Sequence, residues 1–343
     1  MKILALETSC DETSAAVVKD NRGELLLLSN IVSSQINIHK KYGGVVPEVA
    51  ARHHIKNILP VIMEALTEAN VKPQDIDLLS VVSGPGLVTS LLVGIETAKG
   101  LSLAWRKPLL AVNHMYAHIA ANFLDSRLAF PAACLVVSGG HTEIVVLDSY
   151  HKYAKVGQTI DDAAGEAFDK VAKLLDLGYP GGPAVSRLAE EHVGSKKMYP
   201  KINLPRPMLK SDDFNFSFSG LKTAVLYATQ NIRHIDNGFK SAMAYEFQEA
   251  AVEVLTAKTI KAARKYKAKT IMLAGGVAAN KRLREELKTQ AEASGFKFIA
   301  PESKLCTDNA AMVGVAAYYL SAKKKIPLDN YKKTKANPNW ELV

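Results

Sequence analysis

The fold is decided by ILALETSCDETSAAVV (residues 3–18) and by a second stretch of the same build, LVVSGGHTEIVVL (residues 135–147). In each stretch, two apolar runs flank a turn of small and polar residues. This pattern predicts two strands joined by a hairpin. The repetition indicates a duplicated α/β domain, in which we expect the two turns to face a common cleft.

The segments between and after the hairpins alternate between strand and helix patterns, which favours an α/β fold. We expect strands at 78–82 and 270–273, a turn at 179–183, and helices at 55–70, 87–103, 163–175, 239–266, 281–293 and from about 307 to 325. These elements predict a first lobe at 1–130, a second lobe at 131–310, and a terminal helix and basic tail at 311–343 that pack back on the first lobe.

One helix pattern also predicts its buried face. In the segment 239–266, the apolar residues Met243, Phe247, Ala251 and Val254 recur at helical spacing. Such a stripe is typical of a helix side that faces a protein core.

The composition narrows the class of protein. The chain has 343 residues, 48% of them hydrophobic, which is enough for two domains. The net charge of +9 favours a polyanionic partner. Three scattered cysteines indicate a reducing compartment, and neither a signal peptide nor a membrane span is visible. We therefore expect a cytoplasmic protein with no membrane partner.

A pair of histidines predicts a metal site. His114 and His118 lie four residues apart, so on a helix both imidazoles point to the same side and can bind one ion. Zinc proteases of the H-E-x-x-H type have a glutamate after the first histidine as general base, whereas this chain has Met115. The pair therefore indicates a metal site without a hydrolytic base. The alternative is that the two histidines bind no common ion and that each has its own hydrogen-bond partner on the helix.

Several glycine turns are candidates for binding a nucleotide. The turns Ser138-Gly-Gly-His141, Gly181-Gly182 and Gly275-Gly276 can present backbone N–H groups to a phosphate. Gly84-Pro-Gly86 lacks the third glycine and the acidic residue of a dinucleotide-binding fingerprint, and no Walker lysine motif occurs. A nucleotide would thus be held by the backbone. The alternative for each turn is that its glycines serve only the backbone conformation of the turn.

Taken together, these motifs resemble one family. Its motifs occur here in the family's order, as Glu7–Ser14, Gly84–Leu87, His114/His118, Val137–Thr142, Phe216–Lys222, Ala274–Asn280 and Asp308-Asn309. The family is the tRNA threonylcarbamoyl transferases, TsaD in bacteria. The resemblance spans Lys2 to about Leu320 and implies a fold of the actin, sugar kinase and Hsp70 type, with two ribonuclease-H-like lobes around a central cleft.

The resemblance also implies the site residues. It adds Asp308 to His114 and His118 as ligands of one divalent metal ion, with Fe²⁺ favoured and Zn²⁺ as the alternative; Asp308 could instead cap a helix. The substrate contacts that it implies are Val137, Ser138, Gly139, Gly140, His141, Asp169, Gly182, Ser186 and Asn280. Asp169 would accept from a ribose hydroxyl, although a solvated helix side is the simpler explanation for it.

The implied reaction transfers a threonylcarbamoyl group from its adenylate to N6 of a tRNA adenosine and releases AMP. Asp11 and Glu12 are our candidates for accepting the N6 proton or orienting the substrate, although acidic turn residues are usually solvated. The implied partners, besides tRNA and threonylcarbamoyladenylate, are a TsaB-like paralogue of the same fold and a TsaE-like small P-loop ATPase.

The chain has many basic residues, as a tRNA-binding protein requires, but their positions in the sequence do not show where a tRNA would bind. They are Lys258, Lys261, Arg264, Lys265, Lys267, Lys269, Lys281, Arg282, Arg284, Lys323–Lys325, Lys332, Lys333 and Lys335. Such runs are usually solvated. Three other functions stay open: an ATPase or kinase of this fold, a metalloprotease, which Met115 disfavours, and an inactive scaffold, which would be expected to have lost the metal ligands.

Overall fold

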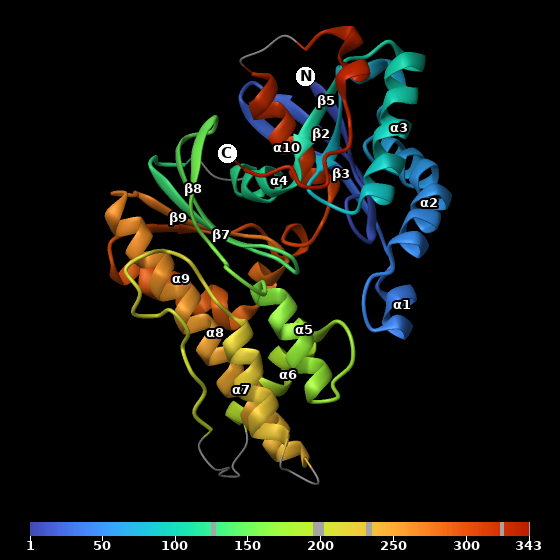
Figure 1. Cartoon of the computed structure of the whole chain (residues 1–343). Helices are drawn as coiled ribbons and strands as arrows, with labels where there is room; N and C mark the ends of the chain where they lie inside the picture. The colour runs from blue at the N-terminus through green and yellow to red at the C-terminus, as the bar shows by residue number, and fades with distance from the viewer. Residues whose placement is uncertain (125–127, 195–201, 231–234, 323–325, 343) are drawn as a thin grey trace. The chain divides into compact units, whose positions relative to one another are not determined.

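The computed structural model describes residues 1–124, 128–194, 202–230, 235–322 and 326–342. The chain divides into two compact units (Figure 1). The first unit combines Met1–Arg127 with Pro301–Val343, and the second unit is Leu128–Ala300. The first unit is therefore built from both ends of the chain, whereas the second is continuous.

The first unit contains a five-stranded sheet in the order β3-β2-β1-β4-β5. Its strands are β1 (Lys2–Glu7), β2 (Glu12–Asn21), β3 (Glu24–Ser34), β4 (Leu78–Gly84) and β5 (Leu109–Asn113). The hairpin strands β1, β2 and β3 pair antiparallel, while β4 and β5 add in parallel on the other side of β1.

The second unit repeats this topology. Its sheet has the order β8-β7-β6-β9-β10, built from β6 (Ala132–Val137), β7 (Thr142–Ser149), β8 (Lys152–Gln158), β9 (Thr270–Ala274) and β10 (Lys297–Ile299). Three antiparallel strands are again followed by two parallel ones. The duplication predicted from the two hairpins is confirmed.

Helices cover both sides of the first sheet. They are α1 (Ile36–His39), α2 (Pro47–Glu68), α3 (Val88–Trp105), α4 (His114–Ala120) and α10 (Ala310–Ser321). Helices α2 and α3 lie on one side and α4 and α10 on the other (Figure 1). A Cβ on Gly314 of α10 would lie 2.6 Å from Val18 of β2, so glycine permits this close packing. Because both sides are covered, β1 is a continuous apolar run that does not alternate.

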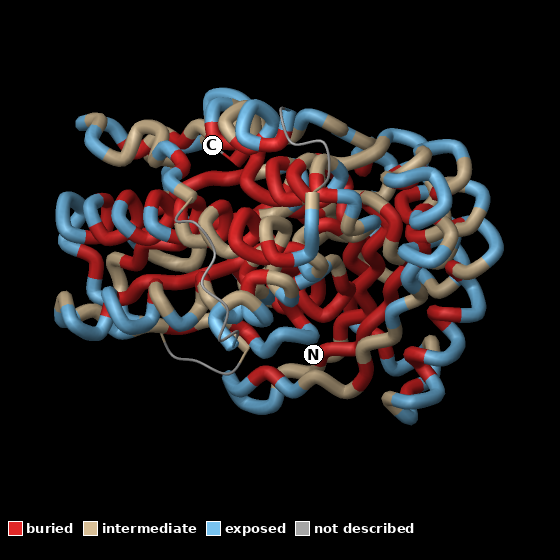
Figure 2. Tube along the Cα trace, turned by 90° about the horizontal axis from the view of Figure 1, so that it is seen from below, coloured by how far each residue is buried: buried red, intermediate tan, exposed pale blue. Residues whose placement is uncertain are grey.

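The helices of the second unit are α5 (Ala164–Leu174), α6 (Gly181–Gly194), α7 (Ser219–Gln230), α8 (Asn237–Lys265) and α9 (Lys281–Ala293). The long helix α8 packs against β6, β7 and β9 and contacts α6, α7 and α9. The predicted stripe of Met243, Phe247, Ala251 and Val254 is buried there, which confirms it as core. Figure 2 shows the buried residues, in red, in the interior and the exposed residues, in pale blue, at the periphery.

Some predicted boundaries were wrong. The turn expected at 179–183 ends early, because α6 already begins at Gly181. The last helix begins at Ala310 rather than near residue 307, and its expected end at Lys323–Lys325 lies outside the described residues. Within the described part of the chain, no helix combines the length and apolarity needed to cross a bilayer.

Candidate functional site: a metal centre and a glycine turn

The two histidines stand on a short, well-capped helix in the first unit. Strand β5 ends at Asn113, whose side chain accepts a hydrogen bond from the N–H of Tyr116 and so starts α4. His114 and His118 follow on the same side of this helix, with ring centroids 4.6 Å apart. Both are buried, at 8% and 1% exposure. The spacing read from the sequence therefore brings the imidazoles together.

Asp308 joins the two histidines from the loop before α10. Its Oδ1 lies 3.1 Å from Nε2 of His118 and 3.5 Å from Nε2 of His114. The cap of α10 is supplied by the next residue, Asn309, whose side chain accepts from the N–H of Met312. The capping role considered for Asp308 is thus filled by its neighbour.

The three side chains fit a single metal ion. One ligand atom from each lies within 4.8 Å of the others. An ion with bonds of about 2.1 Å separates neighbouring ligand atoms by roughly 3.0–3.4 Å, close to the two distances measured here. Two imidazole nitrogens and one carboxylate oxygen are a donor set that suits zinc or non-haem iron. The cluster is therefore compatible with one metal site.

Buried charges dominate the electrostatics of this centre. Burial alone would disfavour the imidazolium of His114, but the carboxylates of Asp308 and Glu7 outweigh it and raise the pKa of His114 to about 9. Burial, together with Asp308 and Asp11, raises the pKa of Glu12 to about 10. A cation among these carboxylates would relieve their mutual repulsion.

The acidic turn with Asp11 and Glu12 belongs to the same unit. Asp11 is buried, and Glu12 accepts a hydrogen bond from the hydroxyl of Ser34 at 3.1 Å. His54 of α2 contacts this turn at two points. Its Nε2 lies 2.9 Å from the carbonyl of Cys10, and its Nδ1 lies 2.8 Å from the hydroxyl of Thr13. Asp11 is therefore withdrawn from solvent, whereas Glu12 is half-buried, and both feel the charge of the other acids in this unit.

In the second unit, the turn Ser138–His141 joins β6 to β7 after the buried Val137. The turn is closed by two hydrogen bonds: Ser138 N–H donates to the carbonyl of His141 at 2.8 Å, and His141 N–H donates to the hydroxyl of Ser138 at 3.1 Å. Apart from the adjacent residues, no atom of the described part of the chain lies within 4 Å of a Cβ built on Gly139 or Gly140. The turn thus leaves open space where a phosphate could approach the backbone.

Asp169 has a structural role that the sequence did not suggest. Its carboxylate accepts hydrogen bonds from the N–H groups of Gly181, at 2.8 Å, and Gly182. It therefore caps α6 from α5 and does not lie on a solvated helix side. Burial raises the pKa of Asp169 despite these bonds. Gly182, by contrast, has open space at its Cα.

Asn280 and Ser186 lie in direct contact. The side-chain amide of Asn280 donates to the hydroxyl of Ser186 at 2.8 Å and to Oε1 of Gln248 at 2.9 Å. Its carbonyl oxygen accepts from the N–H of Leu283 and so caps α9. The two residues expected at the substrate therefore form one polar cluster with Gln248, which sequence reasoning missed.

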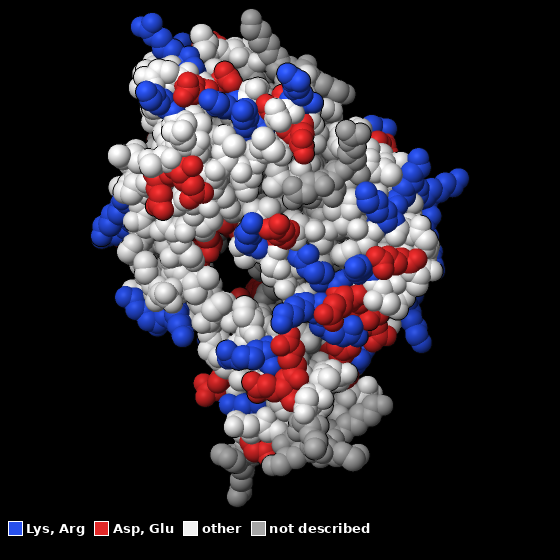
Figure 3. All heavy atoms as spheres, turned by 180° about the vertical axis from the view of Figure 1, so that it is seen from behind, with Lys and Arg blue, Asp and Glu red and all other residues white. Residues whose placement is uncertain are grey.

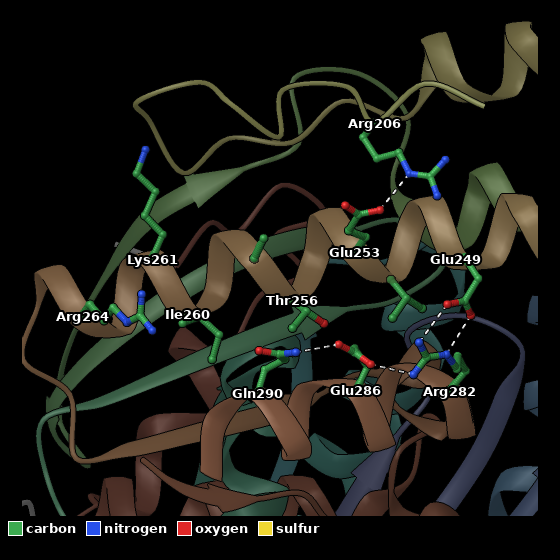
Figure 4. A pocket seen from close by; sticks show the side chains of 12 residues that line it. Arg206, Glu249, Glu253, Thr256, Ile260, Lys261, Arg264, Arg282, Glu286 and Gln290 are labelled. Carbon is green, nitrogen blue, oxygen red and sulfur yellow. Dashed lines mark hydrogen bonds and ion pairs between the residues drawn. The ribbon is translucent and has the colours of Figure 1, made fainter. Parts of the chain in front are cut away.

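Several basic residues of α8, α9 and the segment before them are paired with acids. Arg282 contacts both Glu249 and Glu286, and Arg206 contacts Glu253, around a groove of about 660 Å³ (Figure 4). Lys258 is buried and donates to Ser211 and Asp213. On the face shown in Figure 3, basic and acidic side chains are mixed. A continuous basic groove is not evident among the described residues of this face.

Two further residues of the metal centre were missed. Glu7, the last residue of β1, and Ser9, in the turn that follows, both contact Nδ1 of His114 at 3.1 Å. The available signal was the position of Glu7 at the end of an otherwise apolar strand. A buried carboxylate there needs a partner.

Comparison with solved structures identifies the fold. The HypF protein of T. kodakarensis matches with a TM-score of 0.61 at 15% identity, over 93% of this chain and 48% of HypF. Component A of the (R)-2-hydroxyglutaryl-CoA dehydratase of Acidaminococcus fermentans matches with a TM-score of 0.54 at 15% identity, over 94% and 100%. At such identities the likeness concerns the fold alone, which is of the actin, sugar kinase and Hsp70 type.

Comparison with known sequences identifies the family. A family model described as TsaD, tRNA N6-adenosine threonylcarbamoyltransferase, matches residues 26–315. The protein of that name from Thermosipho africanus is 50% identical over 343 residues, 100% of both chains. The one from Syntrophomonas wolfei is 52% identical over 318 residues, 92% of this chain and 91% of the relative. The chain therefore belongs to the tRNA N6-adenosine threonylcarbamoyltransferase family and is a tRNA-modifying transferase.

Proposed function

We propose that the enzyme transfers the threonylcarbamoyl group of L-threonylcarbamoyladenylate to N6 of adenosine 37, in tRNAs that read codons beginning with A, and releases AMP. The observation that carries this proposal is the cluster of His114, His118 and Asp308 in a chain of this family. Because the acyl group is already activated by its phosphate leaving group, positioning and charge stabilisation suffice and no covalent nucleophile is required.

His114, His118 and Asp308 would hold one divalent ion, and we favour Fe²⁺ over Zn²⁺. When bound, the ion supplies a Lewis acid that polarises the acyl donor. The neighbour of His114 is Met115, which is 2% exposed and carries no base. The site is thus suited to holding an acyl donor and not to activating water.

The second unit would hold the adenylate part of the donor. The open turn of Ser138, Gly139 and Gly140, together with Val137 and His141, would contact the phosphate through its backbone. Asn280 and Ser186 would contact the adenosine, and Asp169 and Gly182 its ribose. Asn280 and Asp169 already cap helices, and both N–H groups of the Asn280 amide are engaged by Ser186 and Gln248. Their substrate bonds would therefore be accepted by the lone pairs that remain on their side-chain oxygens.

The proton of the adenine amine needs an acceptor when the new C–N bond forms. We assign this role, or the orientation of the substrate, to Asp11 and Glu12. The assignment is supported by the position of the two acids in the turn next to Cys10, which His54 holds through its carbonyl. Near-normal modification by both Asp11→Ala and Glu12→Ala, with unchanged folding, would rule the assignment out.

The partners besides tRNA would be a TsaB-like paralogue of the same fold and a TsaE-like P-loop ATPase, in the cytoplasm. A surface that fits a paralogue is the stripe of Ile55, Leu59 and Met63 on α2, which are 65%, 55% and 67% exposed. A stripe at this spacing suits packing against a helix of a partner. Leu59→Glu should abolish co-purification with such a paralogue, whereas Glu64→Gln on the same helix should not.

The decisive experiment is modification in vitro. The full chain, its partners, threonylcarbamoyladenylate and unmodified tRNA are combined with and without a chelator, and the nucleosides are analysed by mass spectrometry. We expect His118→Ala and chelation each to lower the modified yield at least 100-fold, while His151→Ala in the turn between β7 and β8 matches wild type. Full yield with His118→Ala, or ATP turnover without any tRNA modification, would refute the proposal.

A further inference from the structure

We propose that Glu7 is a positioning residue for the metal centre: its buried carboxylate fixes the orientation and tautomer of His114 so that Nε2 faces the ion. The inference rests on the proposed metal site. It assigns a role to a residue that lies outside the three ligands and outside the acidic pair Asp11 and Glu12.

Both oxygens of the Glu7 carboxylate are engaged. Glu7 is the last residue of β1 and is 0% exposed. Its Oε1 accepts a hydrogen bond from the N–H of Ser9 at 2.6 Å, and its Oε2 lies 3.1 Å from Nδ1 of His114. The backbone of the hairpin turn therefore fixes one oxygen, and this orients the other toward the imidazole.

This contact determines the tautomer of His114. An ionised carboxylate can only accept, so Nδ1 must carry the hydrogen that it donates to Glu7. In the metal-bound form, in which the ring is neutral, Nε2 would then keep its lone pair for the ion, and it is this atom that lies 3.5 Å from Asp308. Metal-bound histidines commonly donate their second N–H to a carboxylate in this manner.

Burying a carboxylate costs free energy unless the carboxylate has a partner. The complete burial of Glu7 therefore supports a function for its contact with His114. Among the ion pairs of the described residues, Glu7 occurs with His114 alone. The second histidine provides an internal contrast, because Nδ1 of His118 is buried without a hydrogen-bond partner. Of the two histidines, His114 alone has a carboxylate at its Nδ1 among the described residues, so loss of Glu7 should act through that ligand.

Glu7→Gln keeps the shape of the side chain but removes its charge and its obligatory acceptor character. Substitution of such a supporting carboxylate typically weakens metal binding 10- to 100-fold. Glu7→Asp keeps the charge but shortens the side chain, so we expect an affinity between those of Glu7→Gln and wild type. Glu24→Gln, at the solvent-exposed start of β3, is a matched control that should bind metal as wild type does.

The test measures the affinity of the full chain for Zn²⁺ by competition with a chromophoric chelator, in wild type and in the Glu7, Glu24 and His114→Ala variants. The inference is supported if His114→Ala weakens binding at least 100-fold and Glu7→Gln weakens it about 10- to 100-fold. Weak binding by His114→Ala with wild-type binding by Glu7→Gln would overturn the role of Glu7 and leave the metal site standing. Wild-type binding by His114→Ala would overturn both.

A second measurement reads the tautomer in the wild-type protein itself and needs a variant only to assign the signal. The ¹⁵N shifts of the histidine rings in Zn²⁺-loaded wild-type protein, with His114 assigned by its replacement, report which nitrogen carries the hydrogen. We expect a protonated Nδ1 and a metal-bound Nε2 for His114. Metal bound to Nδ1 would overturn the inference.

Discussion

Asn113 is hydrogen-bonded to Trp340, 227 residues further along the chain: its side-chain amide lies 2.9 Å from the Trp340 carbonyl. The oxygen of the same amide caps the helix that carries His114 and His118. One side chain thus connects the C-terminal segment to the metal helix, and the two functions of its amide can be separated by substitution.

Asn113→Ala should remove both bonds and lower the free energy of unfolding of the first unit by about 2–3 kcal/mol. Asn113→Ser keeps a capping oxygen but cannot reach Trp340, so it should cost only about 1 kcal/mol. Both tryptophans, Trp105 and Trp340, belong to the first unit, so urea unfolding followed by tryptophan fluorescence measures this unit. Equal losses in the two variants would show that the contact with Trp340 contributes nothing.

Gly84→Ala should destabilise the same unit. Gly84 has a φ of +148°, and an added Cβ would lie 1.8 Å from the carbonyl oxygen of Asn337. The C-terminal segment would have to shift, at a cost of about 1–3 kcal/mol. The control is Gly100→Ala in α3, where a Cβ meets no atom within 4 Å; it should be neutral or stabilise by up to about 1 kcal/mol. The fluorescence assay distinguishes these outcomes, and a neutral Gly84→Ala would contradict the packing.

Asp169 substitutions should separate its capping role from its proposed ribose contact. Asp169→Ala leaves two N–H groups of α6 without their acceptor and should cost about 1–2 kcal/mol. Asp169→Asn retains an acceptor and should be close to wild type in stability. If Asp169 also accepts from the ribose, Asp169→Asn should still raise the KM for threonylcarbamoyladenylate several-fold. An unchanged KM in a stable Asp169→Asn protein would leave capping as its function.

The contribution of Asp213 to the stability of the folded protein should depend on pH. Hydrogen bonds from Ser211 and Lys258 lower the pKa of Asp213 from 3.8 to about 2. Since the folded-state pKa lies below the unfolded one, the stabilisation is complete above about pH 4 and is lost as the pH falls toward 2. The difference in Tm between wild type and Asp213→Asn, followed by circular dichroism, should therefore shrink between pH 5 and pH 2.5. A difference that stays constant with pH would contradict this assignment.

The parts of the site that could be predicted are those in which neighbours in sequence are neighbours in space. The spacing of His114 and His118 is a local property of one helix turn, and the hairpin of residues 3–18 is likewise local. Asp308 could not be placed by spacing, because 190 residues separate it from His118. It reaches the histidines only through the packing of α10 on β1 and β2.

The errors have physical causes as well. Gly181 and Gly182 predicted a turn because glycine disfavours a helix, but the carboxylate of Asp169 supplies the cap that lets α6 begin there. Asp169 itself was assigned to a solvated side or to a ribose, since nothing in the sequence near it shows which backbone it contacts. Glu7 was overlooked because its partner, His114, is 107 residues away.

The division of the chain has a consequence for its synthesis. The second unit is continuous and can fold as soon as it has left the ribosome, whereas the first unit lacks α10 until residues 301–343 have been made. Until then, the side of β1 and β2 that α10 covers stays exposed. His114 and His118 have been made by that point, but the carboxylate of Asp308 that completes their cluster has not. Loading of the proposed metal site would therefore be a late event in the maturation of the protein, and it would report that residues 301–343 have packed on the rest of the first unit.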